Sequence, residues 1–298
     1  MINKSEILEI APQALFDEPM KNHTTFRIGG NADCFISAKN TDEIKAVVSY
    51  CKKNSIDFMI MGNGSNMLVS DKGIRGVVIQ VSKAMSECSI NGCEVTAEAG
   101  ILLSALAQRL LKAELSGFEE LSGIPGTLGG GIYMNAGAYG GEIKNILKEV
   151  TFIDREGNIR TLKNHELDLG YRHSVFEDNG GVILSATMLF EKGKYDDIKA
   201  AMAEYTKRRN DKQPISMPSA GSAFKRPEGF FAGKLIEECN LKGFSIGGAQ
   251  ISEKHAGFIV NTGNATAQDV LDLIEHVQKT VKEKFDVVLE PEIRLIGR

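Results

Sequence analysis

The chain has 298 residues, 42% of them hydrophobic and 25% charged, which excludes a disordered protein. The 35 Lys and Arg residues face 39 Asp and Glu, so the net charge of −4 argues against a general nucleic-acid-binding surface, although a local basic groove could hold an anion. No apolar run reaches the ~18–20 residues that span a bilayer, and acidic residues stand where a signal peptide needs an apolar stretch. We therefore expect a cytoplasmic protein of roughly two domains.

The cysteines and histidines show no metal-binding pattern. The five cysteines form no Cys-x-x-Cys pair, and their odd number is typical of reduced thiols in a reducing compartment. The five histidines include no His-x-x-x-His pair, so we expect no metal site. Glycine is frequent, at 31 of 298 residues, and it is clustered.

Hydrophobic periodicity predicts a mixed α and β chain. The first ~20 residues are expected to be a helical lead-in. Residues 41–53 follow as an amphipathic helix that Thr41 caps and Asn54 ends. The next predicted elements are strands at 56–61, 77–81 and 94–100, a helix at 101–115, strands at 148–154, 158–163 and 182–190, and a helix at 195–210.

Residues 213–221, which contain two prolines and small polar residues, are the best candidate for a domain boundary. A helix near 231–240 and two short strands follow. A long helix at 267–284 then begins at a capping box of Thr266 and Asp269. The last predicted strand is 287–296.

The first glycine cluster, Gly-Asn-Gly-Ser-Asn at 62–66, directly follows a predicted strand. Alternating glycines let backbone N–H groups approach a phosphate, and Ser and Asn add donors. The cluster fails the dinucleotide fingerprint, because Met67 stands where the third glycine would fall. Taken alone, it is better explained by an ordinary tight turn.

The second glycine cluster, residues 117–141, holds nine glycines and fits neither a helix nor a strand. Apolar residues such as Ile124 and Leu128 distinguish it from a flexible linker, which would be polar. A P-loop is excluded, because neither Gly-Lys pair is followed by Ser or Thr. We expect this backbone to lie against a flat or phosphorylated ligand.

Together the two clusters resemble the flavin domain of FAD proteins of the vanillyl-alcohol-oxidase type. From Thr24 to its end the chain also resembles the UDP-N-acetylenolpyruvoylglucosamine reductase family. Four motifs carry this resemblance: Ile-Pro-Gly-Thr at 124–127 with Asn-Ala-Gly-Ala-Tyr-Gly at 135–140, Tyr-Arg-His-Ser-Val-Phe at 171–176, Ala-Gly-Ser-Ala-Phe-Lys-Arg-Pro at 220–227, and Leu-Glu-Pro-Glu-Ile-Arg at 289–294. The resemblance implies an α+β fold with two FAD-binding subdomains, 1–82 and 83–211, and a C-terminal α+β substrate domain, 212–298.

The resemblance also implies an activity in peptidoglycan precursor synthesis. NADPH would reduce a non-covalently bound FAD, and the reduced flavin would pass hydride to the enolpyruvyl group of UDP-N-acetylglucosamine-enolpyruvate, giving UDP-N-acetylmuramate. The expected partners are these small molecules, with no nucleic acid and no membrane, and the expected state is a monomer.

Three residues are expected to carry the chemistry. Hydride addition leaves negative charge delocalised into a carboxylate, which the planar fork of Arg172 suits. Ser222 matches the family's proton donor and Glu292 its catalytic carboxylate. Strand alternation puts Glu290 on the same face as Glu292, so the choice between them stays open. Without the resemblance, a surface ion pair, a turn hydroxyl and solvated glutamates would be the better explanations of these residues.

The resemblance implies two sets of binding residues. FAD would lie with its pyrophosphate against both glycine clusters. The expected cofactor-binding residues are Gly62, Asn63, Gly64, Ser65, Asn66, Ile124, Pro125, Gly126, Gly129, Gly130, Asn135 and Ala138. Tyr171, Lys225 and Arg226 are expected to bind substrate.

One form of this family carries an inserted loop whose tyrosine closes over the substrate. Here residues 191–194 lead directly to the helix near Tyr195, so the chain resembles the shorter form, and Tyr195 is not expected to act as the lid. Two alternatives remain: another FAD oxidoreductase of the same fold, which would react with oxygen, and a non-catalytic sensor of flavin or a UDP-sugar.

Overall fold

The computed structural model describes residues 2–81 and 83–297. Its contacts group them into two compact units. The first unit comprises residues 2–15, 35–63 and 77–209, and the second comprises 16–34, 64–76 and 210–297. The division at 82 and 211 stays a prediction, and the structure adds that 16–34 and 64–76 group with the C-terminal residues.

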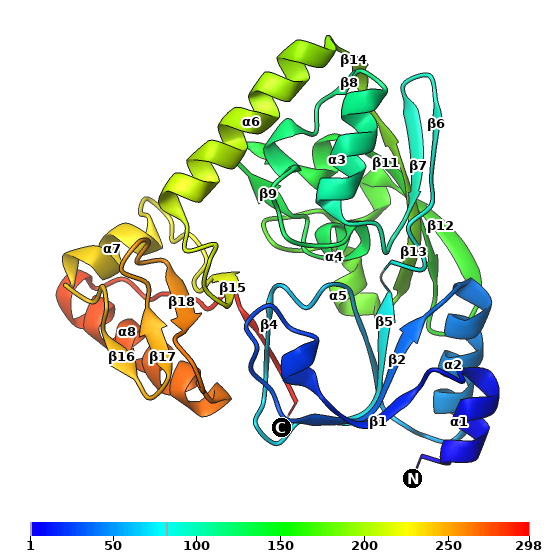
Figure 1. Cartoon of the computed structure of the whole chain (residues 1–298), viewed down its shortest axis with the longest axis horizontal. Helices are drawn as coiled ribbons and strands as arrows, with labels where there is room; N and C mark the ends of the chain where they lie inside the picture. The colour runs from blue at the N-terminus through cyan, green and yellow to red at the C-terminus, as the bar shows by residue number, and fades with distance from the viewer. Residues whose placement is uncertain (1, 82, 298) are drawn as a thin grey trace. The chain divides into compact units, whose positions relative to one another are not determined.

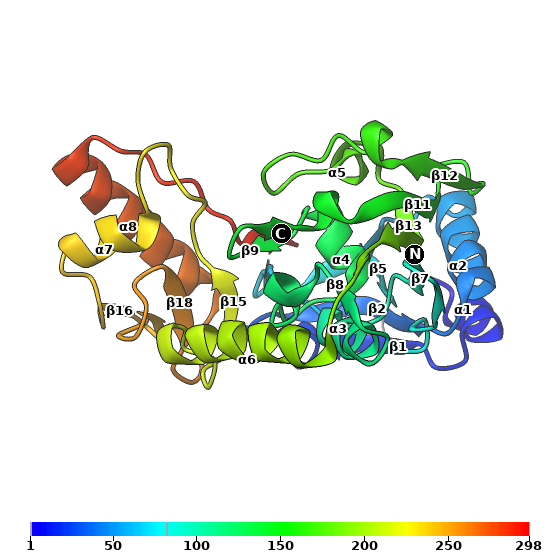
Figure 2. The ribbon, with the colours of Figure 1, turned by 90° about the horizontal axis from the view of Figure 1, so that it is seen from above.

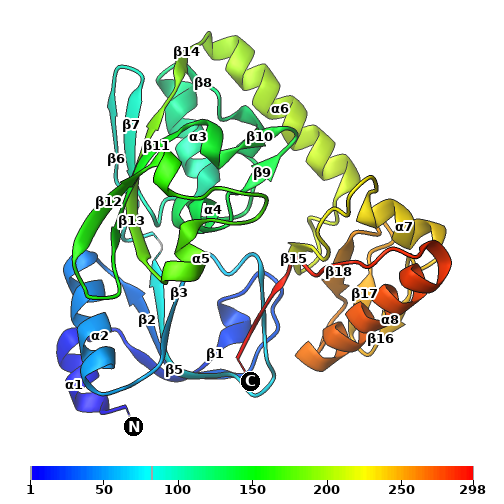
Figure 3. The ribbon, with the colours of Figure 1, turned by 180° about the vertical axis from the view of Figure 1, so that it is seen from behind.

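The first unit is built on a five-stranded antiparallel sheet in the order β12-β11-β13-β7-β6, whose strands can be followed in Figure 3. Its strands are β6 (Cys88–Asn91), β7 (Glu94–Glu98), β11 (Leu147–Ile153), β12 (Ile159–Lys163) and β13 (Val182–Leu189). Val150 of β11 lies opposite Ala186 and Leu162 in the neighbouring strands. Alternate side chains such as Val95 and Ala97 are buried, as expected for a sheet covered on one face.

Helix α4 (Leu128–Tyr133) packs on β7 and β13 of this sheet (Figure 1). The unit also contains α3 (Leu103–Lys112) and α5 (Val175–Asn179), and α6 (Tyr195–Lys212) begins in it. Two small antiparallel pairs complete the unit: β8 (Leu115–Ser116) with β14 (Glu191–Lys192), and β9 (Gly137–Ala138) with β10 (Gly141–Glu142). The chain enters α6 directly after β14, as expected for the shorter form.

The chain passes from one unit to the other along strands of a four-stranded sheet. This sheet has the order β1-β2-β5-β3. Its strands are β1 (Leu15–Pro19), β2 (Asn31–Ala38), β3 (Phe58–Met61) and β5 (Ile74–Val81). Helices α1 (Lys4–Ile10) and α2 (Thr41–Lys53) pack on each other. The side chain of Asn40, and not the predicted Thr41, caps α2 by accepting from the Glu43 N–H at 2.9 Å, whereas Asn54 ends the helix as predicted.

The second unit contains an antiparallel sheet in the order β15-β18-β17-β16, with α8 along it and α7 against α8 (Figure 2). The elements are β15 (Ser219–Ser222), α7 (Ala232–Glu238), β16 (Ser245–Ile246), β17 (Ala249–Ile251), β18 (Phe258–Asn261) and α8 (Ala267–Phe285). A parallel pair, β4 (Met67–Val69) with β19 (Arg294–Ile296), completes the unit. The predicted capping box of Thr266 and Asp269 is confirmed.

Three sequence predictions are wrong in part. Residues 15–19 form a strand instead of continuing the N-terminal helix. The second glycine cluster contains a short helix, α4, because Thr127 caps it and Leu128 and Ile132 are buried. The last strand covers only 294–296, because residues 290–292 pair with the segment 223–225 in an isolated bridge before the chain joins β4. In the part of the chain that the structure describes, no helix is both long and apolar enough to span a membrane.

Candidate active site

The two glycine clusters meet inside the first unit. Asn63 Nδ2 donates to the carbonyl oxygen of Pro125 at 3.2 Å, and Gln80 Nε2 donates to that of Gly62 at 3.2 Å. A Cβ built on Gly62 would lie 2.2 Å from Thr127 Oγ1. Only glycine therefore fits at this position without displacing the threonine. The Asn63–Pro125 hydrogen bond thus joins segments that are 62 residues apart in the chain.

The two clusters differ in the backbone N–H groups that they leave available. The N–H groups of Gly126, Gly129 and Gly130 donate to protein acceptors at 2.9, 2.8 and 3.3 Å. Those of residues 63–65 make no hydrogen bond to any of the residues that the structure describes. Free N–H groups on a glycine-rich loop bind phosphate oxygens. Residues 63–65 therefore fit the pyrophosphate of FAD better than 126–130 do.

The first cluster continues into the second unit at Gly64. This residue has a φ of +62°, which favours glycine, and its carbonyl accepts from the Thr25 N–H at 3.2 Å. Asn66 Nδ2 donates to the carbonyl oxygen of Glu292 at 3.3 Å, and the Arg294 N–H donates to the Asn66 carbonyl at 3.0 Å. A predicted cofactor-binding residue thus contacts a predicted catalytic one within the second unit.

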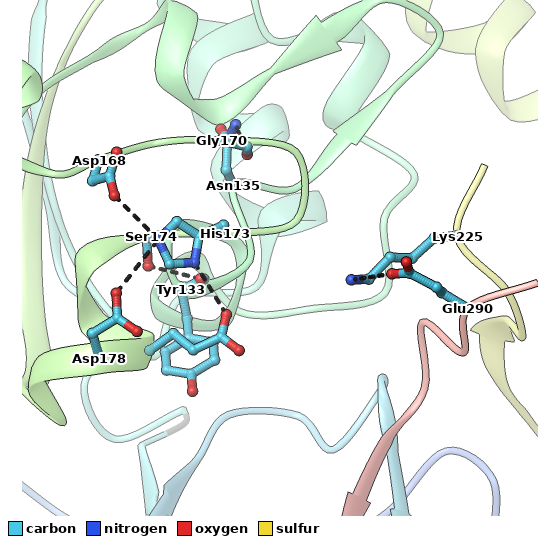
Figure 4. A network of polar contacts seen from close by, with 10 residues as sticks. Tyr133, Asn135, Asp168, Gly170, His173, Ser174, Asp178, Lys225 and Glu290 are labelled. Atoms are coloured by element: carbon cyan, nitrogen blue, oxygen red, sulfur yellow. Dashed lines mark hydrogen bonds and ion pairs between the residues drawn. The ribbon is translucent and has the colours of Figure 1, made fainter. Parts of the chain in front are cut away.

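Arg172 lies in a tight turn of the first unit. The N–H and C=O groups of Gly170 and His173 pair with each other at 3.2 and 3.4 Å, and Arg172 has a φ of +58° between them. Ser174 anchors the chain just after this turn, because its buried Oγ donates to the Tyr133 carbonyl oxygen at 2.7 Å. Figure 4 shows these anchors around the turn. The half-buried guanidinium lies 5.1 Å from the ring centre of the exposed Tyr171.

The His173 ring lies between a carboxylate that precedes this turn and carboxylates that follow it. Its ring nitrogens lie 3.4 Å from Asp168, 3.4 Å from Glu177 and 3.6 Å from Asp178 (Figure 4). Asp168 precedes the turn, whereas the other two carboxylates belong to α5. The carboxylates of both Asp residues are largely exposed, so each contact is individually weak.

Ser222 and Glu292 are held side by side in the second unit. Ser222 ends β15 and lies opposite Phe258 of β18. The Glu292 N–H donates to the carbonyl oxygen of Ala223, the next residue, at 2.8 Å. The Ser222 hydroxyl is exposed and has no hydrogen-bond partner among the described residues. It is therefore available to a ligand.

The structure separates the two glutamates that the sequence left equivalent. The Glu290 carboxylate is 71% exposed and forms an ion pair with Lys225 at 3.2 Å. Glu292 is half-buried and its backbone is fixed at both ends, to Ala223 and Asn66. Arg226 stacks on Phe231, with its guanidinium carbon 4.0 Å from the ring centre. Lys225 and Arg226, predicted to bind substrate, thus lie in the segment that carries Ser222.

The remaining predicted residues lie in the first unit. Ala138 pairs with Gly141 in the β9–β10 hairpin. Asn135 is buried, with its side chain hydrogen-bonded to the protein. Two residues that contact the predicted set were missed. Thr127 carried a signal, since a threonine before an apolar residue is typical of a helix start. Glu142, which contacts Asn135, carried none.

Comparisons with known proteins place this arrangement in a family. A model described as the UDP-N-acetylenolpyruvoylglucosamine reductase C-terminal domain matches residues 213–296, and a model of an FAD binding domain matches 32–163. A UDP-N-acetylenolpyruvoylglucosamine reductase from Caldanaerobacter subterraneus subsp. tengcongensis is 52% identical and covers 94% of this chain and 93% of its own. The chain belongs to the UDP-N-acetylenolpyruvoylglucosamine reductase family.

Two further relatives support this membership. The UDP-N-acetylenolpyruvoylglucosamine reductase of Clostridioides difficile is 51% identical over 94% of this chain and 92% of its own. The crystal structure of UDP-N-acetylenolpyruvylglucosamine reductase from Thermus caldophilus is 34% identical and has a TM-score of 0.82, covering 96% of this chain and 98% of that one. The family and the α+β fold class predicted from the sequence are confirmed.

Proposed function

We propose that this chain reduces the enolpyruvyl group of UDP-N-acetylglucosamine-enolpyruvate to UDP-N-acetylmuramate, a step of peptidoglycan precursor synthesis. NADPH is the reductant and non-covalent FAD is the cofactor, in accord with the FAD-binding region at 32–163. The observation that carries this proposal is that Ser222, whose hydroxyl has no partner among the described residues, directly precedes Ala223, to which the Glu292 backbone is hydrogen-bonded in the second unit. A protein that only binds flavin or a UDP-sugar has no need of a proton donor.

The first glycine cluster is the part of the proposed cofactor set that best fits the pyrophosphate of FAD. The free N–H groups of residues 63–65 would hold the pyrophosphate, and Gly62 permits the close approach of Thr127. The second cluster, including Ile124, Pro125 and Gly129, presents little charge and close-packed backbone. When bound, FAD supplies hydride that originates from NADPH.

Each proposed catalytic residue answers one demand of the reaction. Addition of hydride to the terminal carbon leaves charge on the next carbon and its carboxylate, which Arg172 stabilises as a permanently charged donor. Ser222 Oγ gives its proton to the carbanionic carbon. Glu292, held beside it, hydrogen-bonds the enolic form of the intermediate, for which its carboxyl group needs a proton or a neighbouring cation. Tyr171, Lys225 and Arg226 are proposed to bind the substrate.

We propose further that the enzyme works in the cytoplasm as a monomer on soluble small molecules. The net charge of −4 accords with this, since it gives no general attraction for nucleic acid.

The test is an anaerobic titration of the purified protein, followed by flavin absorbance. NADPH should bleach the yellow colour, and the enolpyruvyl substrate should restore it. UDP-N-acetylglucosamine, which lacks the vinyl group, should leave the protein bleached. An oxidase of the same fold would recover its colour only with oxygen, and a sensor would not respond to the substrate. A protein that takes up no FAD would disprove the proposal.

A further inference from the structure

The turn that presents Arg172 depends on a residue from another part of the chain. Asn135 Nδ2 donates to the Gly170 carbonyl oxygen at 2.9 Å, on the other side of the turn from Ser174 (Figure 4). Gly170 is also the residue whose backbone closes the turn against His173. A shift of the Gly170 carbonyl would therefore move the backbone that aims the Arg172 side chain.

The amide of Asn135 is fully engaged with the protein. Besides Gly170, Nδ2 donates to Glu142 Oε2 at 3.0 Å, so both N–H groups are used. Its Oδ1 accepts from the Lys144 N–H at 3.0 Å. The residue is 1% exposed and has a φ of +40°, a region that asparagine tolerates better than most residues. Such a side chain has no N–H group left to offer a cofactor.

Glu142 connects Asn135 with the charge on Arg172. A Cβ built on Gly137 would lie 2.9 Å from Glu142 Cγ and 3.7 Å from Arg172 Nη1, so both side chains pass the same glycine. Lys144 Nζ lies 2.8 Å from the Glu142 carboxylate. The hydrogen bond from Lys144 is the main cause that lowers the pKa of Glu142, and the Asn135 amide and the Arg172 charge act in the same direction. The carboxylate facing Arg172 is thus held ionised.

We propose that Asn135 is a positioning residue for Arg172: its amide fixes the Gly170 end of the turn and the Glu142 carboxylate in one geometry. This inference rests on the proposed function, in which Arg172 stabilises charge on the substrate. The inference gives the side chain of Asn135 a role in the reduction of the substrate. Only the backbone of Asn135 would then contact FAD. Asn135 therefore matters after the flavin has been reduced, and not for holding or reducing it.

The test is Asn135→Asp, which keeps the size, the backbone tolerance and the acceptor for Lys144 but removes both donors. The matched control is Asn164→Asp, because Asn164 Nδ2 also makes two hydrogen bonds in the first unit, to the carbonyl oxygens of Lys144 and Leu147 at 2.8 and 2.7 Å, instead of to Gly170 and Glu142. Flavin content, flavin reduction by NADPH and reoxidation by the enolpyruvyl substrate are measured anaerobically by stopped flow.

Asn135→Asp should keep its FAD and its reduction rate, whereas the limiting rate of reoxidation should fall roughly ten- to a hundred-fold, as for a displaced catalytic group. Asn164→Asp should keep both rates. In an Arg172→Ala background, Asn135→Asp should slow reoxidation no further, because its effect acts through the missing guanidinium. Flavin loss, equal slowing of both half-reactions, or full additivity with Arg172→Ala would overturn the inference. Failure of wild-type protein to be reoxidised by the substrate would refute the proposed function instead.

Discussion

Gly62→Ala tests the contact between the two glycine clusters. The new Cβ would lie 2.2 Å from Thr127 Oγ1, about 1 Å inside an ordinary contact of carbon and oxygen. Thr127 cannot rotate away freely, because it is buried and its Oγ1 caps α4 by accepting from the Gly130 N–H. Loss of a cap costs about 1 kcal/mol and overpacking about 1–3 kcal/mol. We expect the free energy of unfolding to fall by about 1–3 kcal/mol.

The measurement is urea unfolding of the apoprotein together with the dissociation constant of FAD. Gly131→Ala is the matched control, since its Cβ would meet only Leu103 and Ile143, at ordinary distances of 3.5 to 3.7 Å, and a helical Ala is favoured by about 1 kcal/mol. Gly62→Ala should weaken FAD binding, because the backbone of the first cluster must move, whereas Gly131→Ala should not.

A double variant, Gly62→Ala with Thr127→Ala, removes the clash along with the cap. Its loss of stability should be smaller than the sum of the two single losses, since the atoms that collide are no longer both present. If Gly62→Ala is as stable as Gly131→Ala, the close contact is refuted. If it is destabilised yet binds FAD with unchanged affinity, the cofactor does not depend on this part of the loop.

Three further predictions concern the second unit. Ser222→Ala should leave flavin reduction by NADPH near the wild-type rate and slow reoxidation by substrate by ~10²–10⁴ in stopped flow, because only the second step needs a proton; equal slowing of both steps would show that Ser222 positions the flavin. Glu292→Gln should slow reoxidation, whereas Glu290→Gln should change its limiting rate little, and the reverse order would reassign the carboxylate. The pKa of Asp269 is lowered mainly by the hydrogen bond from the Thr266 N–H, so its stabilising effect is lost as the pH falls below about 4. Unfolding curves of Asp269→Asn should therefore vary less with pH in that range, and an unchanged slope would contradict this.

Local sequence patterns were enough to predict an element that has both a capping signal and a periodic apolar stripe. The helix at 267–284 had both a capping box and an apolar stripe, and α8 follows it closely. The helix at 41–53 had the stripe, but the predicted cap Thr41 was wrong, because the side chain of Asn40 accepts from the Glu43 N–H. Helix α4 was missed because three consecutive glycines oppose a helix, and burial of Leu128 and Ile132 overrides that propensity.

The candidate site was predictable as a set of residues but not as a set of contacts. Motif order identified Arg172, Ser222 and Glu292 without showing what holds them. The contact of Gly62 with Thr127 joins segments far apart in the chain, and no local pattern encodes it. Strand periodicity also left Glu290 and Glu292 equivalent, whereas the structure separates them by the ion pair and exposure of Glu290 and by the backbone contacts of Glu292.

Backbone strain gives an argument for Arg172 that does not depend on motifs. An arginine with a φ of +58° is held in a region that costs a side-chain-bearing residue roughly 1–2 kcal/mol. Glycine would remove this cost but also the guanidinium. Asn135, whose amide donates to Gly170 of the same turn, also has a positive φ. Strain of this kind persists where surrounding contacts over-determine the backbone, and it concentrates at functional sites. The strained backbone of this turn therefore supports the proposal that Arg172 stabilises charge on the substrate.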